Sequence, residues 1–231
     1  MSSIRLITYN IHHGTNADET PSLHNITDLL SDLDPDIIAL QEVDKNLARS
    51  GRQHQASVLA QRLNMNFVYA GALQYSNGEY GNALLSRLPI ISYKKHLLPD
   101  PAENRCLMEA VVQGPTRPVG IFNVHMSLNA SMRQKHLNDF ILPRLEACPY
   151  PLILMGDFNS TNDQKDINLL TARLTDTFYF NQGVITNTFS SSQPVKRIDY
   201  IFADKRFVVQ NYFIVDSQAS DHLPVAVQIQ I

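Results

Sequence analysis

The residues of this sequence best suited to chemistry follow a short apolar segment at 152–155. Pro151 and Gly156 bound this segment, and a short apolar run with such boundaries predicts a buried strand. Asp157 and Asn159 come directly after it, and alternation along an extended chain points both side chains to one side. A carboxylate and an amide in that position suit a hard cation and a phosphoryl oxygen. Alone, the pattern is more typical of a strand followed by a turn, so its interpretation depends on the rest of the chain.

Polar residues end other predicted strands in the same way. A buried strand at 37–40 is followed by Gln41 and Glu42, and a strand at 119–124 is followed by His125. One apolar strand that ends in a carboxylate says little, but five such positions suggest strands whose ends converge on one site. The five positions are Asn10, Glu42, His125, Asp157 with Asn159, and Asp221 with His222.

The side chains at these positions indicate a metal-dependent site. Carboxylate and amide oxygens suit Mg²⁺ or Mn²⁺, and the scarcity of cysteine argues against softer metals. Histidines beside carboxylates can contact phosphoryl oxygens or transfer protons. Asp199 lies within a predicted strand at 197–202, where a carboxylate needs a buried partner, and Arg197 is one candidate.

Many strands with few helices between them position these residues. A helix is predicted from Thr20 as N-cap, with Pro21 in its first turn, to Leu33, and 78–82 is predicted to be a loop. A chain of many strands with few helices favours an α+β fold in which sheet packs on sheet with helices outside. Further helices are expected at 53–63, 131–147 with a kink or restart near Pro143, and 166–174. Strands are expected at 4–9, 37–40, 67–70, 83–86, 90–97, 106–113, 119–124, 152–155, 197–202, 207–215 and 225–231.

Length and composition fit one catalytic domain over residues 1–231. The 44% hydrophobic content suffices for a sizeable core, and no apolar run reaches membrane-spanning length. We find no signal peptide, and the two cysteines, Cys106 and Cys148, suit a reducing compartment, so we expect a cytoplasmic protein. The net charge of −3 does not indicate a strongly basic DNA-binding surface.

Four segments together resemble the endonuclease/exonuclease/phosphatase superfamily, whose members include DNase I, abasic-site endonucleases, neutral sphingomyelinases, inositol-polyphosphate 5-phosphatases and tyrosyl-DNA phosphodiesterase 2. The segments occur in family order, and the resemblance extends from Thr8 to His222. It implies a DNase I-like, four-layered α/β/β/α sandwich of two mixed, mostly antiparallel sheets packed face to face. The segments are Leu-Gln-Glu-Val at 40–43, Gly-Asp-Phe-Asn at 156–159, Arg-Ile-Asp-Tyr at 197–200 and Ser-Asp-His at 220–222.

The resemblance also implies a role for each matched residue. Glu42 is expected to be the principal ligand of Mg²⁺ or Mn²⁺, helped by Asn10 and Asp221. Asp157 is expected to orient or deprotonate the attacking water. His222 would lie against the scissile phosphate, and Asp199 would accept its other ring N–H, which favours the imidazolium.

The remaining matched positions imply phosphate contacts. Asn159 would hold a phosphate oxygen, and His125 would be a second phosphate contact or a proton donor. His125 belongs to an element similar to the family's His-Leu-Ser, although this chain has Met126 in place of Leu. Arg87 and Arg105 are further candidates. Tyr80 either packs in its loop or points at the substrate.

These roles predict a divalent-metal-dependent phosphodiesterase that acts by in-line attack of an activated water. Its substrate is expected to be a nucleic acid, a phospholipid head group or a small phosphodiester. The enzyme is expected to be a monomer that does not insert stably into a membrane. A DNA nuclease, a phosphoinositide or sphingomyelin-type lipid phosphoesterase, and a catalytically silent binding module remain alternatives. Abasic endonucleases carry Asp where this chain has His12, which argues against that activity. His12 and His13 are interpreted as loop residues in preference to metal ligands.

Overall fold

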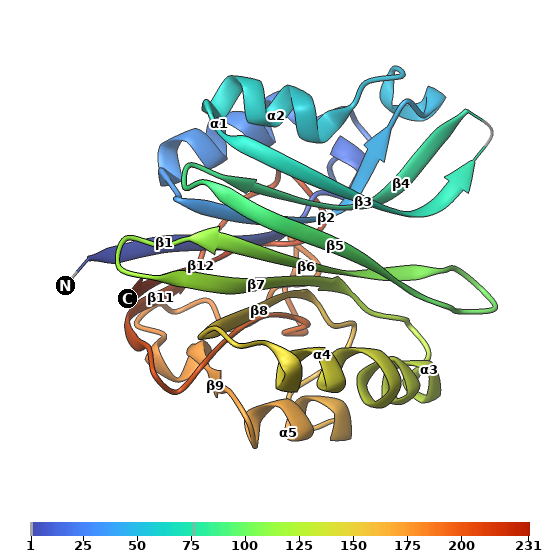
Figure 1. Cartoon of the computed structure of the whole chain (residues 1–231). Helices are drawn as coiled ribbons and strands as arrows, with labels where there is room; N and C mark the ends of the chain where they lie inside the picture. Colours follow the sequence, from blue (N-terminus) through green and yellow to red (C-terminus); the bar gives the residue numbers. More distant parts are fainter. Residues whose placement is uncertain (1, 76) are drawn as a thin grey trace.

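Two sheets packed face to face form the centre of the molecule (Figure 1). The structure, a computed structural model, describes residues 2–75 and 77–231. Within these ranges twelve strands form two six-stranded sheets, and helices cover the outer face of each (Figure 1). This arrangement confirms the predicted α/β/β/α sandwich of mixed, mostly antiparallel sheets.

The first sheet brings three of the predicted polar positions to one end. Strands β1 and β2 run parallel, so Asn10 at the end of β1 pairs with Gln41, next to Glu42. Strand β12 is antiparallel to β1, so it starts at this end, shortly after His222. In spatial order the sheet consists of β11 (Val208–Ile214), β12 (Val225–Gln230), β1 (Ser3–Asn10), β2 (Ile37–Lys45), β4 (Gly78–Ser86) and β3 (Asn66–Tyr75).

The second sheet brings together three more of the polar residues. Its strands β7 and β8 are parallel, and His125 pairs with Asp157 where both strands end. Strand β10 is antiparallel to β8 and begins with Asp199 opposite Asp157. In spatial order the sheet consists of β5 (Ile90–Leu98), β6 (Arg105–Gln113), β7 (Pro118–His125), β8 (Leu152–Asp157), β10 (Asp199–Ala203) and β9 (Thr175–Asp176).

Helices bury the outer face of each sheet through apolar stripes (Figure 1). Ile26 and Leu30 pack in the cluster over the first sheet, and Leu137 and Ile141 in the cluster over the second. None of the helices in the described residues is long and apolar enough to cross a membrane. The α-helices are α1 (Leu23–Leu33), α2 (Gln55–Leu63), α3 (Ala130–His136), α4 (Leu142–Ala147) and α5 (Lys165–Thr171).

The interface between the sheets is mostly apolar, and buried amides such as Asn82 and Asn123 hydrogen-bond across it. Asn123 on β7 donates from Nδ2 to the carbonyls of Leu40 (2.9 Å) and Ala83 (2.8 Å) in the other sheet. Its Oδ1 accepts from Gln41 Nε2 at 2.8 Å. Because buried polar groups are costly without partners, these three bonds fix the two sheets against each other. The contact lies beside Glu42.

The predicted start of the first helix is wrong for a reason that lies outside the local sequence. Helix α1 begins at Leu23 with Ser22 as N-cap, because Thr15 bridges to Pro21 and holds Thr20 in the preceding loop. The prediction of a kink or restart near Pro143 is confirmed as a restart, because α4 begins at Leu142. A π-helical turn over Leu137–Ile141 joins α3 to α4, and the proline lies in the first turn of α4.

Strand β4 corrects the loop prediction for 78–82. These residues pair with β2 on one side and β3 on the other, so long-range pairing overrides the local Gly and Asn signals. Gly81 lies so close to β3 that a Cβ atom would lie 2.0 Å from the carbonyl oxygen of Ala70. The glycine that suggested a loop therefore permits close strand packing.

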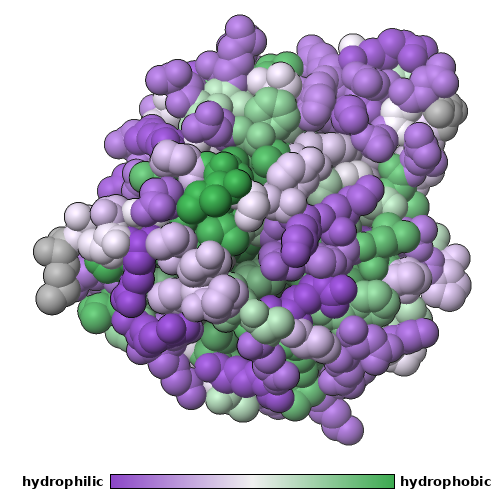
Figure 2. All heavy atoms as spheres, viewed as in Figure 1, coloured by the Kyte–Doolittle hydropathy of each residue, from purple (hydrophilic) through white to green (hydrophobic). Residues whose placement is uncertain are grey.

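The molecular surface is mostly hydrophilic in the view of Figure 2, with smaller hydrophobic areas between polar ones. Exposed apolar side chains include Ile91, Tyr93 and Leu97 on the edge strand β5. Lys94 and Lys95 lie between Tyr93 and Leu97 on the same strand, and charged side chains on an edge strand disfavour pairing with another sheet.

Candidate active site

The polar ends of both sheets form the wall of one cleft of about 660 Å³. This volume lies in the range of small-molecule binding sites. Asn10 and Asp199 lie beneath the surface and hydrogen-bond to residues of the wall. Eight of the predicted site residues line it: Glu42, Tyr80, Arg105, His125, Asp157, Asn159, Asp221 and His222.

His222 joins two buried carboxylates. Its Nδ1 lies 2.9 Å from Asp199 Oδ2, and its Nε2 lies 3.7 Å from Asp157 Oδ2. Although burial lowers the pKa of His222, the negative charges of Asp199 and Asp157 raise it above its usual value. Burial and the nearby Asp199 charge raise the pKa of Asp157. The predicted pairing of Asp199 with His222 is present, and Arg197 instead pairs with Asp176.

His125 has the opposite electrostatic environment. Arg105 Nη1 donates to its Nδ1 at 3.1 Å, so the proton of a neutral ring is on Nε2. Burial and the positive charge of Arg105 lower the pKa of His125 to about 3. Its Nε2 lies 3.5 Å from Asp157 Oδ2 and 3.2 Å from Asn159 Nδ2. At neutral pH His125 is therefore an uncharged donor.

A β-bulge turns Glu42 into the cleft. The pairing of β2 with β4 shifts between Leu40 and Val43, and Glu42 adopts a left-handed backbone with φ of 58°. Asn10 Nδ2 donates to Glu42 Oε1 at 3.0 Å. Although burial raises the pKa of Glu42, nearby His125 and this hydrogen bond lower it to about 2. Glu42 is therefore ionised at neutral pH.

The Asn10 amide connects the two sheets at the floor of the cleft. The same Nδ2 also donates to Asp157 Oδ2 at 3.0 Å. Its Oδ1 accepts from the backbone N–H of His12 at 3.1 Å. In this arrangement Asn10 orients Glu42 and Asp157, and the amide would have to turn over to present its oxygen to a cation.

Asn159 reaches the cleft through a tight turn after β8. Its φ is 48°, a region that asparagine tolerates better than most residues, and its N–H donates to Asp157 Oδ1 at 2.8 Å. Its Nδ2 donates to the carbonyl of Met126 at 3.0 Å. The predicted alternation is thus replaced by a turn that still places both residues on one wall.

Tyr80 and Asp221 lie on the side of the cleft that the first sheet forms. Burial and the Glu42 carboxylate raise the pKa of Tyr80 well above its usual value, and the Arg49 guanidinium lies 5.3 Å from the Tyr80 ring centroid. Ser220 Oγ donates to Asp221 Oδ1 at 3.2 Å. Tyr80 therefore lies in the wall of the cleft on strand β4, which favours the prediction that it points at the substrate over the prediction that it packs in a loop.

The two arginine predictions have different outcomes. Arg105 lines the cleft, and its Nε is buried with no hydrogen-bond partner among the described residues. Arg87 is a wrong prediction, because β4 runs antiparallel to β2 and Ser86 pairs with Ile37 at the far end of the sheet. Its guanidinium pairs there with Asp34.

Several residues of the cleft carry no signal in the sequence. Three cations, Arg49, Arg133 and Lys196, line it in addition to Arg105. Leu128 and Tyr75 form part of its rim, with 76% and 48% of their surfaces exposed. Leu128 lies in a loop and Tyr75 at the end of β3, and Arg133 lies on helix α3. No repeated spacing links these residues in the sequence, so only tertiary structure brings them together.

The donor set fits a hard divalent cation. Glu42 and Asp221 present carboxylate oxygens to one cleft, and Glu42 is ionised, as a metal ligand must be. Asp157, Asp199 and His222 also offer ligand atoms within 4.8 Å of one another. The hydrogen bond between Asp199 and His222 already occupies two of those atoms, and His222 forms an ion pair with Asp157 at 3.7 Å.

Known proteins are similar to this chain in sequence or in fold. YbhP, an uncharacterized protein of Escherichia coli (strain K12), is 26% identical over 246 residues, covering 99% of this chain and 97% of YbhP. A functionally unknown conserved protein from Enterococcus faecalis V583 superposes with a TM-score of 0.84 at 21% identity, covering 98% and 99% of the two chains. The Bacteroides thetaiotaomicron mannosyl-6-phosphatase Bt3783 gives 0.84 at 18% identity, covering 99% and 100%.

At 21% and 18% identity, the similarity to the two solved structures shows only that the fold is shared. The sequence itself is more specific, because residues 7–222 match the model of the Endonuclease/Exonuclease/phosphatase family. The match extends from strand β1 to His222 and includes both sides of the cleft. This chain therefore belongs to the Endonuclease/Exonuclease/phosphatase family, whose enzymes commonly act on phosphate esters with divalent metals.

Proposed function

We propose that this protein is a divalent-metal-dependent phosphodiesterase that hydrolyses its substrate by in-line attack of water. The observation that carries the proposal is the buried Asp157 carboxylate, whose Oδ2 faces His222 Nε2 at 3.7 Å and His125 Nε2 at 3.5 Å. A carboxylate with a raised pKa among such donors suits a general base at neutral pH.

Asp157 orients the attacking water and accepts its proton. The water oxygen forms a bond to phosphorus while the bond from phosphorus to the leaving oxygen breaks, and the leaving oxygen takes a proton from solvent. His222, kept as an imidazolium by Asp199, neutralises charge that develops on the phosphate. Asp199 positions the ring and does not contact the substrate.

Three donors on the second sheet's side hold the phosphate. His125 donates from Nε2, because its Nδ1 accepts from Arg105. Asn159 contributes its amide, and the unpartnered Nε of Arg105 gains an acceptor when an anion enters. Burial makes each of these interactions stronger than the same contact in water.

Glu42, Asp221 and Asn10 form the metal site in this proposal, with Mg²⁺ or Mn²⁺ as the ion. Their ligand atoms are oxygens, which these ions prefer, and Asn10 supplies its oxygen when its amide turns over. When bound, the cation supplies positive charge to the phosphate oxygens and the leaving group. Glu42 is the principal ligand, because its low pKa keeps it ionised.

The substrate is proposed to be a small phosphodiester. A cleft of about 660 Å³ suits a compact substrate better than a long duplex, and the net charge is −3. Bt3783 is described as a mannosyl-6-phosphatase, which supports phosphate-ester chemistry on this fold. A nuclease is the alternative within the same chemistry, and the proposed enzyme is a monomer in the cytoplasm.

A phospholipid head group is a second candidate substrate. Leu128 and Tyr75 expose apolar surface at the rim of the cleft, where a lipid chain would leave it. Apolar side chains beside a polar site favour contact with a lipid surface.

The test is Mg²⁺- and Mn²⁺-dependent hydrolysis across substrate classes. The panel contains a chromogenic phosphodiester, plasmid and abasic DNA, phosphoinositide vesicles and sphingomyelin vesicles, with His222→Ala as the blank. Activity that needs metal and disappears in His222→Ala supports the proposal, and the substrate cleaved identifies the class. Metal binding without turnover on any substrate would favour the catalytically silent binding module.

A further inference from the structure

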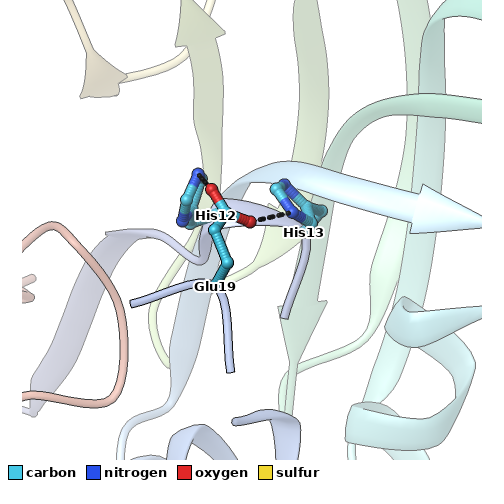
Figure 3. A group of neighbouring side chains, drawn as sticks. All are labelled: His12, His13 and Glu19. Atoms are coloured by element: carbon cyan, nitrogen blue, oxygen red, sulfur yellow. Dashed lines mark ion pairs between the residues drawn. The ribbon is translucent and has the colours of Figure 1, made fainter. Parts of the chain in front are cut away.

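A second group of side chains with possible metal-ligand atoms consists of His12, His13 and Glu19 (Figure 3). It borders the proposed magnesium site, because His12 Nδ1 lies 3.9 Å from Asp221 Oδ1. His12 Nε2 lies 3.5 Å from Glu19 Oε1, and His13 Nε2 lies 3.4 Å from Glu19 Oε2. Both histidines line the cleft, and their ring centroids are 4.5 Å apart. The carboxylate thus lies between two imidazoles, as Figure 3 shows.

The hydrogen bonds of Thr15 determine the orientation of the His12 ring. The Thr15 hydroxyl donates its one proton to the carbonyl of His12 at 2.9 Å. At 3.2 Å it can therefore only accept from His12 Nδ1, whereas its contact with His13 Nε2 is longer, at 3.4 Å, and does not fix the tautomer of that ring. With the proton on Nδ1, a neutral His12 turns the lone pair of Nε2 toward a carboxylate oxygen. Two facing electron pairs are stabilised by a cation between them.

The three residues of this group have an unfavourable backbone conformation. His12, His13 and Glu19 have φ values of 43°, 44° and 57°, in the left-handed region that non-glycine residues rarely adopt. The Asn16 side chain fixes the loop by accepting from the N–H groups of Asp18 and Thr20. Glu19 is 67% exposed on its side chain, yet its position is set by this loop.

We propose that His12, His13 and Glu19 bind a zinc ion at the mouth of the cleft. Zinc bonds of about 2.1 Å in tetrahedral geometry place ligand atoms about 3.4 Å apart, which matches both contacts. Two imidazoles with one carboxylate suit zinc, whereas the all-oxygen set around Glu42 suits magnesium. Three protein ligands leave a fourth position for water or an oxygen anion in the cleft.

The primary test is equilibrium dialysis of the full chain against Zn²⁺ with millimolar Mg²⁺ present. The wild type is expected to bind one zinc ion, and Glu19→Gln and His13→Asn to bind it at least about 100-fold more weakly. Asparagine is chosen at position 13 because it tolerates the left-handed backbone. The readout is bound zinc, so failure of the proposed phosphodiesterase activity would leave the result interpretable.

Two control variants locate the zinc. Glu42→Gln changes the magnesium site, and His96→Asn removes a histidine paired with Glu109 at 2.7 Å on β5 and β6. Both are expected to keep zinc binding. Zinc binding that persists in both Glu19→Gln and His13→Asn, or that disappears in Glu42→Gln, overturns the proposal.

The orientation of His12 has its own test. Thr15→Val removes the hydroxyl at Nδ1 and keeps the shape of the side chain, so zinc affinity is expected to fall about tenfold. Visible absorption of the Co²⁺-substituted protein reports the coordination of the ion, and the spectrum is expected to be four-coordinate and lost in Glu19→Gln. An unchanged affinity in Thr15→Val, or a six-coordinate spectrum in the wild type, overturns the site as proposed.

Discussion

The two sheets contribute opposite halves to one cleft. On the side of the first sheet, Glu42 and Asp221 have about a fifth of their side chains exposed (20% and 22%). On the side of the second sheet, Asp157 and His125 are buried, with 2% and 5% exposed. The exposed half can exchange a hydrated cation, while the buried half controls proton affinity.

Glu42 and Asp157 show how the difference arises. The same Asn10 amide donates to both carboxylates. The pKa of Glu42 nevertheless falls to about 2, whereas that of Asp157 is raised by burial and by the charge of Asp199, which lies opposite it in the sheet. Two carboxylates with separated pKa values are suited to a ligand and a base. Variants of one half should therefore respond to metal concentration, and variants of the other to pH.

The largest effect is expected from Asp157→Asn on the buried half. Loss of the base should lower kcat/KM by about 10⁴-fold, because a neutral amide cannot accept the proton of the water. The Mg²⁺ concentration for half-maximal activity should not change. Steady-state kinetics against Asp163→Asn, an exposed neighbour, measures this. Residual activity above a tenth of wild type would exclude Asp157 as the base.

A smaller loss is expected from Glu42→Gln on the exposed half. Its kcat/KM should fall about 10³-fold at low Mg²⁺, since the principal charged ligand is gone, and recover in part as Mg²⁺ increases. A magnesium titration compares it with Glu79→Gln, which removes a carboxylate paired with Lys45 on the adjacent strands. A loss that no magnesium concentration alters would contradict the division between the halves.

Asp199→Asn tests the pH response of the buried half. Loss of its charge removes the strongest influence that raises the pKa of His222, and one influence, second to burial, that raises the pKa of Asp157. Asp157 then ionises at lower pH, and His222 also loses its proton at lower pH. The bell-shaped profile of kcat/KM should move as a whole to lower pH, with a maximum reduced about 100-fold. A profile that stays in place or moves upward would refute this pairing.

Much of this site was predictable from strand ends in the sequence. Asn10, His125 and Asp157 end their strands as predicted, because buried strands have a strong apolar signal and sharp boundaries. The family resemblance added the pairing of Asp199 with His222, which the sequence spacing alone left open.

The remaining features depend on pairing between distant segments. The bulge that turns Glu42 into the cleft arises where β2 meets β4, and the local sequence predicted only a strand end. The prediction for Arg87 is wrong for the same reason, because the direction of β4 in the sheet decides at which end Arg87 lies. The sequence also gave no reason to expect that Asn123 joins the sheets.

Asn123→Ala is expected to have the smallest effect and to act on both halves together. It removes the donor to the carbonyls of Leu40 and Ala83 and one of the acceptors of the Gln41 amide, which should cost about 2 kcal/mol of unfolding free energy. Urea denaturation measures this against Asn66→Ala, whose amide makes one 3.4 Å bond on the edge strand. Because Gln41 directly precedes Glu42, kcat/KM should fall with little change in either metal or pH dependence. Unchanged stability would mean that apolar packing alone keeps the two halves in register.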